Sequence, residues 1–189
     1  DRDSTLWIGT ESGHLGILRD SLIELAPLQL DQPGSKGSID ALLTDSKGRV
    51  WIGTSRGLYL AQKTAAKLVQ ASYLGENTEI HALTEDPTGQ IWVGTNSGVV
   101  RYDGDSYSHH DLSAADVPDR SVYCLVADER QVWLGTGNGL IRYDGKEWLP
   151  LKSGDRSLAY RMASAIFDSE GNIWFGTDGG GARKITEGI

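Results

Sequence analysis

The sequence predicts an all-β protein, a β-propeller assembled from four-stranded antiparallel blades of about 41 residues each. Three observations favour this fold: the tetrapeptide Trp-x-Gly-Thr occurs five times, glycine reaches about twice its usual share, and no segment keeps a helical period of apolar residues. The repeats are 44, 41, 41 and 41 residues apart. Their tryptophans are Trp7, Trp51, Trp92, Trp133 and Trp174. Because five of the six tryptophans occupy one repeat position, the spacing is not a product of chance.

Each repeat unit is predicted to form four strands, a to d, and the third copy shows them best. Its expected strands are 80–84, 90–95, 99–102 and a last one near 106–109. Asp86-Pro87-Thr88-Gly89 reads as a type I turn between strands a and b, because Asp and Gly stand where this turn prefers them. An Asp recurs before the Trp in the other copies, and we expect it to cap the same turn. These residues are Asp45, Asp86, Asp128 and Asp168.

One four-stranded blade cannot bury both of its faces, so the blades must stack. We interpret each repeat Trp as a wedge between successive blades, whose burial contributes up to about 4–6 kcal/mol. The Gly after it allows the neighbouring backbone to come close. A small residue recurs in strand a, as expected for inner strands that crowd around an axis. These residues are Ala41, Ala82, Cys124 and Ser164, so we expect Cys124 to serve packing and not catalysis.

The blade boundaries follow from the repeat. We expect one propeller unit over 1–189, with blade pieces at about 1–31, 38–72, 79–112, 121–152 and 162–189. The first piece holds strands b, c and d and the last holds a, b and c, so the two cannot merge into one closing blade. The sequence therefore predicts an open arc or a fragment of a larger propeller, which self-associates or packs with missing blades.

Composition excludes several function classes. The chain has 18 Lys and Arg against 26 Asp and Glu, a net charge of −8, which disfavours binding to nucleic acid or to anionic lipid. A single cysteine rules out an intrachain disulfide. We find no metal-ligand spacing, Ser-His-Asp set or phosphate-binding loop, so we expect no metal, no cofactor and no catalysis.

The segment Ile39–Leu58, with its Asp-x-x-Gly turn before Trp-Ile-Gly-Thr, resembles the two-component regulator propeller repeat, and so does Ile80–Tyr102. The fourth copy departs from the pattern because its turn has lost the Gly and one residue. The resemblance implies a non-catalytic sensory domain of a bacterial histidine kinase, hybrid regulator or diguanylate cyclase. It also implies a periplasmic location and a membrane tether to an output domain outside this chain. Some members of the family sense glycans.

The binding surface is predicted on the face formed by the b–c and d–a loops, because these loops vary while the body of the repeat stays constant. The candidate residues are Arg56, Asn96, Asn138, Asp178, Arg120, Tyr160, Arg161 and His81, with Lys36 and Glu79 nearby. Arginine suits an anionic group and tyrosine stacks on a sugar ring, so the expected ligand is a glycan or another small anionic molecule. The alternative interpretation is that these loops vary only because turns that face solvent are free to vary, without binding a ligand. His109 and His110 are expected on the solvated surface.

Two other functions stay open. The propeller could be a scaffold for protein assembly without a small ligand. It could also be an enzyme similar to the streptogramin lyases, propellers that use a His with nearby acids. The sequence shows no paired His and Glu that matches their arrangement.

Overall fold

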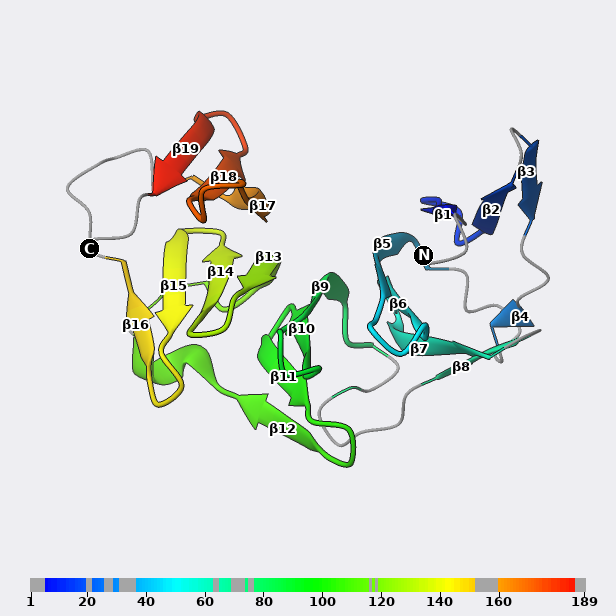
Figure 1. Ribbon diagram of the computed structural model, residues 1–189, viewed down its shortest axis with the longest axis horizontal. Helices are drawn as coiled ribbons and strands as arrows, with labels where there is room; N and C mark the ends of the chain where they lie inside the picture. The colour runs from blue at the N-terminus through cyan, green and yellow to red at the C-terminus, as the bar shows by residue number, and fades with distance from the viewer. Residues whose placement is uncertain are drawn as a thin grey trace.

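A computed structural model describes residues 6–19, 22–25, 29–30, 37–62, 65–68, 74, 77–115, 117, 119–151 and 160–185. Within these residues the chain forms five sheets that stand as an open arc around a common centre, each with its first strand innermost (Figure 1). The one helical element among the described residues is a short 3-10 turn, η1 (Leu112–Ala115). The prediction of an all-β propeller that does not close is therefore confirmed.

The strands follow one another from the centre outward in each sheet. The first sheet contains β1 (Leu6–Gly9), β2 (Leu15–Arg19) and β3 (Leu22–Leu25). The second contains β5 (Ile39–Thr44), β6 (Val50–Thr54), β7 (Gly57–Gln62) and β8 (Ala65–Leu68). The third contains β9 (Ile80–Glu85), β10 (Ile91–Thr95), β11 (Gly98–Tyr102) and β12 (Tyr107–His110). The fourth contains β13 (Val122–Ala127), β14 (Val132–Thr136), β15 (Gly139–Tyr143) and β16 (Trp148–Pro150). The fifth contains β17 (Met162–Phe167), β18 (Ile173–Thr177) and β19 (Gly181–Ile185).

One strand has no counterpart in the repeat. β4 (Gln29–Leu30) pairs in parallel with β8 and so adds a fifth strand to the outer edge of the second sheet. All other strand pairs are antiparallel. The repeat predicts none of this pairing, because β4 follows the last strand of the first blade and has no counterpart in the other copies.

The repeated Asp does two tasks in three of the copies. In the third copy, one carboxylate oxygen of Asp86 accepts hydrogen bonds from the backbone N–H groups of Thr88 and Gln90. These bonds fix the turn between strands a and b. Its other oxygen accepts the indole N–H of Trp92 at 2.9 Å. The corresponding Asp–Trp distances are 2.8 Å for Asp45–Trp51 and 2.9 Å for Asp168–Trp174. The Asp thus holds both the turn and the ring of the Trp six residues later.

In the fourth copy, whose turn is shorter, the Asp keeps the turn but does not bind the indole N–H of the Trp. Asp128 still accepts the backbone N–H groups of Arg130 and Gln131, at 2.7 and 2.8 Å. The indole nitrogen of Trp133, now only five residues away, is buried without a hydrogen-bond partner among the described residues. The loss of one residue therefore leaves one buried donor unsatisfied.

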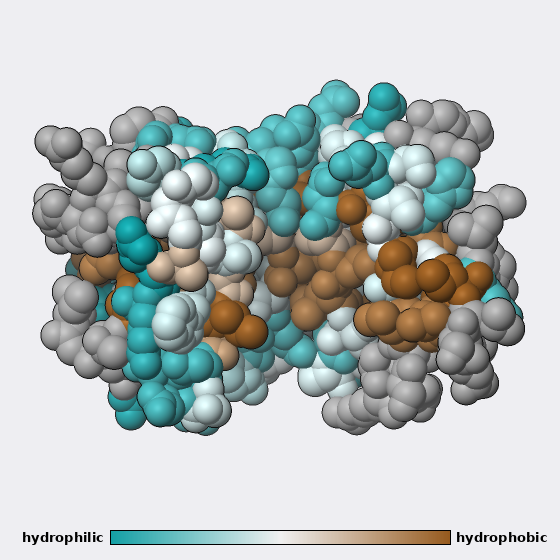
Figure 2. All heavy atoms as spheres, turned by 90° about the horizontal axis from the view of Figure 1, so that it is seen from above, coloured by the Kyte–Doolittle hydropathy of each residue, from teal (hydrophilic) through white to brown (hydrophobic). Residues whose placement is uncertain are grey.

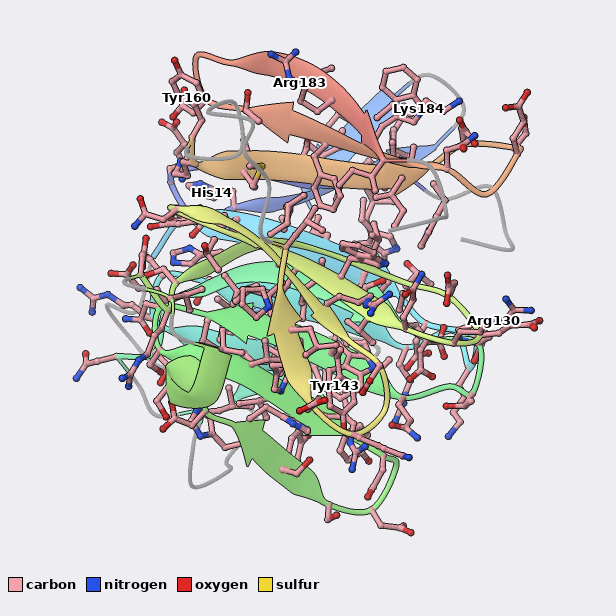
Figure 3. The ribbon with its side chains drawn as sticks, turned by 90° about the vertical axis from the view of Figure 1, so that its left-hand side faces the viewer. His14, Arg130, Tyr143, Tyr160, Arg183 and Lys184 are labelled. Carbon is pink, nitrogen blue, oxygen red and sulfur yellow. The ribbon has the colours of Figure 1, made fainter. Side chains whose placement is uncertain are left out.

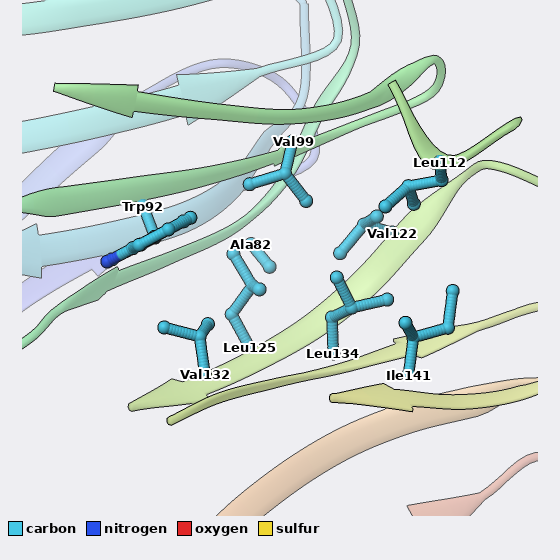
Figure 4. Close-up of a cluster of buried hydrophobic side chains, with 9 residues drawn as sticks. All are labelled: Ala82, Trp92, Val99, Leu112, Val122, Leu125, Val132, Leu134 and Ile141. Carbon is cyan, nitrogen blue, oxygen red and sulfur yellow. The ribbon is translucent and has the colours of Figure 1, made fainter. Parts of the chain in front are cut away.

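Four of the five repeat tryptophans pack against the following sheet, as the wedge interpretation requires: three are buried, and Trp7 is half-buried against a cluster that includes Val50, Ile52 and Tyr59 of the second sheet. Trp51, Trp92 and Trp133 are 1, 2 and 5% exposed. Their ring partners in the following sheet are Tyr102 for Trp51 (5.5 Å), Tyr143 for Trp92 (5.6 Å) and Phe175 for Trp133 (6.4 Å between centroids). Figure 4 shows Trp92 facing Val132 and Leu125 across the interface between the third and fourth sheets.

The ends of the arc differ from its interior. Trp174, on the last sheet, is 38% exposed, and Ile166 on the same sheet is 64% exposed. At the other end Leu6 and Ile23 of the first sheet are exposed. Figure 2 looks into the open side of the arc and shows hydrophobic side chains over the first sheet. The interpretation of Trp174 as a wedge is therefore not met, because no further sheet covers it in the part of the chain that the structure describes.

The glycine of Trp-x-Gly-Thr sets how closely successive sheets approach. A Cβ on Gly94 would lie 2.8 Å from Cγ1 and 3.0 Å from the carbonyl oxygen of Val122, the first residue of the next inner strand. The equivalent glycines of the other copies face the first residue of the next inner strand in the same way: Gly9 faces Ile39, Gly53 faces Ile80 and Gly135 faces Met162. Only a residue without a side chain allows these contacts.

Candidate functional site

The b–c turns and the d–a loops meet on one face of the arc. The N–H of Asn96, at the tip of a b–c turn, donates to the carbonyl of Glu79 in the preceding d–a loop at 3.1 Å. The N–H of Asp178 donates in the same way to Arg161 at 2.9 Å. Figure 3 shows the molecule edge-on, with Tyr160 on this loop face and Arg130, in an a–b turn, on the opposite face.

The residues predicted from the sequence lie along this face on several blades. Those at b–c tips are Arg56, Asn96, Asn138 and Asp178; those just before inner strands are Arg120, Tyr160 and Arg161; His81 lies within β9. Lys36 lies outside the described residues. Tyr160 is 45% exposed, and its ring packs so closely on Gly180 that a Cβ there would lie 2.7 Å from it.

Five side chains on this face form a continuous chain of contacts across three blades. The ring of His81 stacks on Tyr123 of the next inner strand, with centroids 5.1 Å apart and an interplanar angle of 27°. The guanidinium carbon of Arg161 lies 4.5 Å from the centroid of Tyr123. The chain ends in two carboxylates: Glu79 lies 3.8 Å from His81 Nε2, and Asp178 lies 3.4 Å from Arg161 Nε. We call these five residues the axial cluster.

The axial cluster joins three of the predicted site residues, His81, Arg161 and Asp178, and the nearby Glu79 to one residue that the sequence did not single out. Tyr123 is the central member, since it contacts both His81 and Arg161. A signal for it does exist in the repeat. Tyr123 occupies the second position of its inner strand. This position differs from copy to copy, whereas the positions before and after it carry the same type of residue in each copy.

The charge of this face is acidic. Arg120 pairs with Asp111 at 3.5 Å and Arg161 pairs with Asp178 at 3.4 Å, so neighbouring carboxylates offset two of the three predicted arginine charges. The loop face carries six carboxylates in its described part against three arginines. These carboxylates belong to Glu11, Asp40, Glu79, Asp111, Asp119 and Asp178. Exposed pairs of this kind add little stability, but they reduce the attraction for an anion.

His110 is not on the solvated surface, and that prediction is wrong. Its ring lies 5.4 Å from Trp92, 5.4 Å from Tyr143 and 5.7 Å from Trp148, in the interface between the third and fourth sheets. Burial there, with repulsion from the charge of Arg101 and from His109, lowers the pKa of His110 to about 4. His109 is half-buried. The outer strand d therefore contributes to the interface between blades.

Other groups point to packing. Cys124 is buried in the interface between the fourth and fifth sheets, and burial raises the pKa of its thiol to about 12, so it stays protonated. In the part of the chain that the structure describes, no three His, Cys, Asp or Glu side chains are grouped to hold a metal ion. No described helix has the length and apolar character to cross a membrane.

The chain resembles solved β-propellers along nearly its whole length. The extracellular domain of the BT4673 signalling system from B. thetaiotaomicron is 22% identical, with a TM-score of 0.59 over 98% of this chain and 33% of that one. PorZ, a surface component of the type-IX secretion system of Porphyromonas gingivalis, is 16% identical, with a TM-score of 0.75 over 97% and 31%. Virginiamycin B lyase from Staphylococcus aureus is 16% identical, with a TM-score of 0.70 over 96% and 66%. These likenesses establish the fold, and the chain spans about a third of the BT4673 domain.

Two of the repeats match a known family model. None of the curated proteins compared with the chain matches it. The model of the two-component regulator propeller family matches residues 33–56 and 74–97, which cover the turn, the Asp and the Trp-x-Gly-Thr of the second and third copies. The chain is thus a β-propeller segment in which two of the five repeats match the model of the two-component regulator propeller family.

Proposed function

We propose that this propeller is the ligand-recognition part of a bacterial sensor that lies outside the cytoplasm and is tethered to the inner membrane. The output domain, a kinase or a cyclase, would lie elsewhere in the full-length protein. The proposal is supported by the family of the repeats and by the extracellular origin of the BT4673 domain. The chain itself acts without catalysis: ligand binding changes how the propeller packs against its partner and so shifts the equilibrium between signalling states.

The observation that carries the proposal is the axial cluster. It places two aromatic rings, an arginine and two carboxylates in mutual contact at the inner end of the loop face, across three blades. Half-exposed polar groups held by a rigid β scaffold are suited to recognition. The acidic balance of the face favours a hydroxyl-rich, uncharged glycan over an anion, because carboxylates accept hydrogen bonds from hydroxyl groups and repel negative charge.

Calorimetric titration with three probes tests the proposal: neutral glucose oligomers, galacturonate oligomers and heparin oligosaccharides. We expect the neutral probe to bind, and Arg161→Ala to weaken binding about tenfold, the loss of roughly one good polar contact. Arg130→Ala on the opposite face is the matched control and should leave the affinity unchanged. If no probe binds, or if both variants behave alike, the assembly scaffold becomes the better description.

One observation favours a second candidate, a propeller enzyme. His81 and Glu79 form an acid–imidazole pair at 3.8 Å on the loop face, and virginiamycin B lyase shares the fold. In this candidate His81 acts as a general base oriented by Glu79. Turnover of quinupristin that disappears in His81→Ala supports the enzyme; absence of turnover in the unchanged protein removes it.

A further inference from the structure

Every inner strand of the last four sheets contains a β-bulge at the same place. The register between strands a and b shifts one residue after strand a begins, so that two residues of strand a face a single pairing position. The residue left over in each bulge is the second of its strand. These four bulge residues are Asp40, His81, Tyr123 and Ala163.

Packing on both sides of the blade explains the bulge. The residue before it packs backward: Ile80 lies against Gly53 of the preceding sheet. The residue after it packs forward: Ala82 lies opposite Gly94 of its own sheet, where a Cβ would lie 3.2 Å from it. In a regular strand, residues two apart share one face. Ile80 and Ala82 are two residues apart and yet face opposite interfaces, which is possible because His81 between them lies in the bulge.

The bulge residue consequently belongs to neither of the buried apolar clusters that join the blade to its neighbours. Its flanking positions repeat, with an apolar residue before it and a small one after it in every copy. The bulge position itself does not repeat and carries an acid, an imidazole, a phenol and a methyl group in turn. Asp40 and Ala163 are exposed, and His81 and Tyr123 are half-buried. Freed from packing, this position can change without cost to the stack of blades.

Adjacent bulge residues also meet. His81 and Tyr123 come from neighbouring blades and stack at 5.1 Å, which places the bulges on one continuous surface near the centre of the arc. Arg161, which contacts Tyr123, directly precedes the next inner strand. The bulges thus supply the central members of the axial cluster.

We propose that the four bulge residues are the positions that determine ligand specificity, one from each blade, while the repeated residues around them only build the scaffold. The inference rests on the proposed function and assigns its selectivity to particular residues. Asp40 supplies an acceptor for a hydroxyl group, and the stacked pair of His81 and Tyr123 supplies an imidazole and a phenol hydroxyl as hydrogen-bonding groups. Ala163 leaves room for the ligand beside Tyr123.

The same calorimetric titrations with the neutral, galacturonate and heparin probes test the inference on two sets of single variants. The bulge set is Asp40→Ala, His81→Ala and Tyr123→Ala, and the matched loop-tip set is Asn96→Ala and Asn138→Ala. We expect the bulge variants to lower affinity about tenfold or to change which probe binds best, while the loop-tip variants stay within about threefold of the parent. Thermal unfolding should shift by no more than a few degrees in either set, because these side chains lie outside the buried apolar clusters between the blades.

The outcomes separate the two proposals. If the loop-tip variants lose binding and the bulge variants keep it, the loop face binds the ligand but the bulge residues do not select it. If the parent protein binds a probe but neither set changes the affinity, the inference is refuted; if the parent protein binds none of the probes, both proposals are refuted. A bulge variant that lowers the melting temperature as strongly as a core substitution also contradicts the inference, since it would place that side chain in the packing.

Discussion

Restoring the lost residue of the fourth turn should stabilise the protein. We consider a Gly inserted between Arg130 and Gln131, which recreates the Asp-x-x-Gly-x-x-Trp spacing of the third copy. In that spacing Asp86 holds the indole of Trp92 at 2.9 Å, whereas Trp133 now has a buried indole nitrogen without a partner among the described residues. The insertion brings a carboxylate oxygen of Asp128 within reach of this nitrogen.

The magnitude follows from the cost of a buried unsatisfied donor, about 1–3 kcal/mol. One extra loop residue costs well under about 1 kcal/mol. The expected net gain is therefore about 1–2 kcal/mol, or a rise of about 2–8 °C in melting temperature for a chain of this size. Urea denaturation followed by circular dichroism measures the gain, and the indole N–H resonance of Trp133 should shift on forming the bond.

A second substitution separates the hydrogen bond from the turn. In the inserted chain, Asp128→Asn keeps an oxygen for the backbone N–H groups but presents an NH2 group to the indole, so the gain should vanish. If the insertion destabilises the protein, or if Asp128→Asn leaves the gain intact, then the spacing of Asp and Trp does not act through this hydrogen bond.

Three further predictions concern the interfaces between blades and the ends of the arc. Gly94→Ala should destabilise the protein by about 1–3 kcal/mol, because the new Cβ meets the backbone of Val122. Gly176→Ala meets only the movable Ser164 hydroxyl and should cost less than about 1 kcal/mol. Equal losses of stability in urea denaturation would contradict this prediction. The pKa of His110 is lowered from 6.5 to about 4, so the unfolded chain binds a proton more readily than the folded chain does. The free energy of unfolding should therefore fall by about 1–2 kcal/mol as the pH drops from about 6.5 toward 4, after allowance for partial exposure. His110→Phe should remove this loss, and a pH profile of stability that this variant leaves unchanged would refute the prediction. The exposed ends should make the chain self-associate, and Ile166→Lys should reduce its apparent mass in light scattering; a monomer at all concentrations would show that these faces do not pair.

The repeat predicts what recurs and misses what does not. The spacing of the five Trp-x-Gly-Thr units places four strands in each complete blade, because every blade must bury the same face. β4 could not be foreseen, since Gln29–Leu30 has no equivalent in the other copies. His110 was misjudged for a similar reason. An outer strand looks solvated in isolation, and only the neighbouring blade with Tyr143 and Trp148 buries it.

On the loop face, too, part of the candidate site could be predicted from the sequence and part could not. The variation of the turns predicted its location, and His81, Arg161 and Asp178 do lie in one contact chain. Tyr123 was missed because a β-bulge is a property of pairing between strands, and the sequence of one strand does not reveal it. Once the bulge is known, the non-repeating second position of each inner strand becomes readable from the sequence alone.

Residue-resolved hydroxyl-radical footprinting of the tryptophans tests most directly whether each indole is covered by the blade that follows it. At a concentration where the chain is monomeric, Trp174 should be oxidised much faster than Trp51, Trp92 and Trp133, in line with its 38% exposure against 1, 2 and 5%. Equal oxidation of all four rings, or protection of Trp174 together with rapid oxidation of Trp92, would contradict the stacking of successive blades.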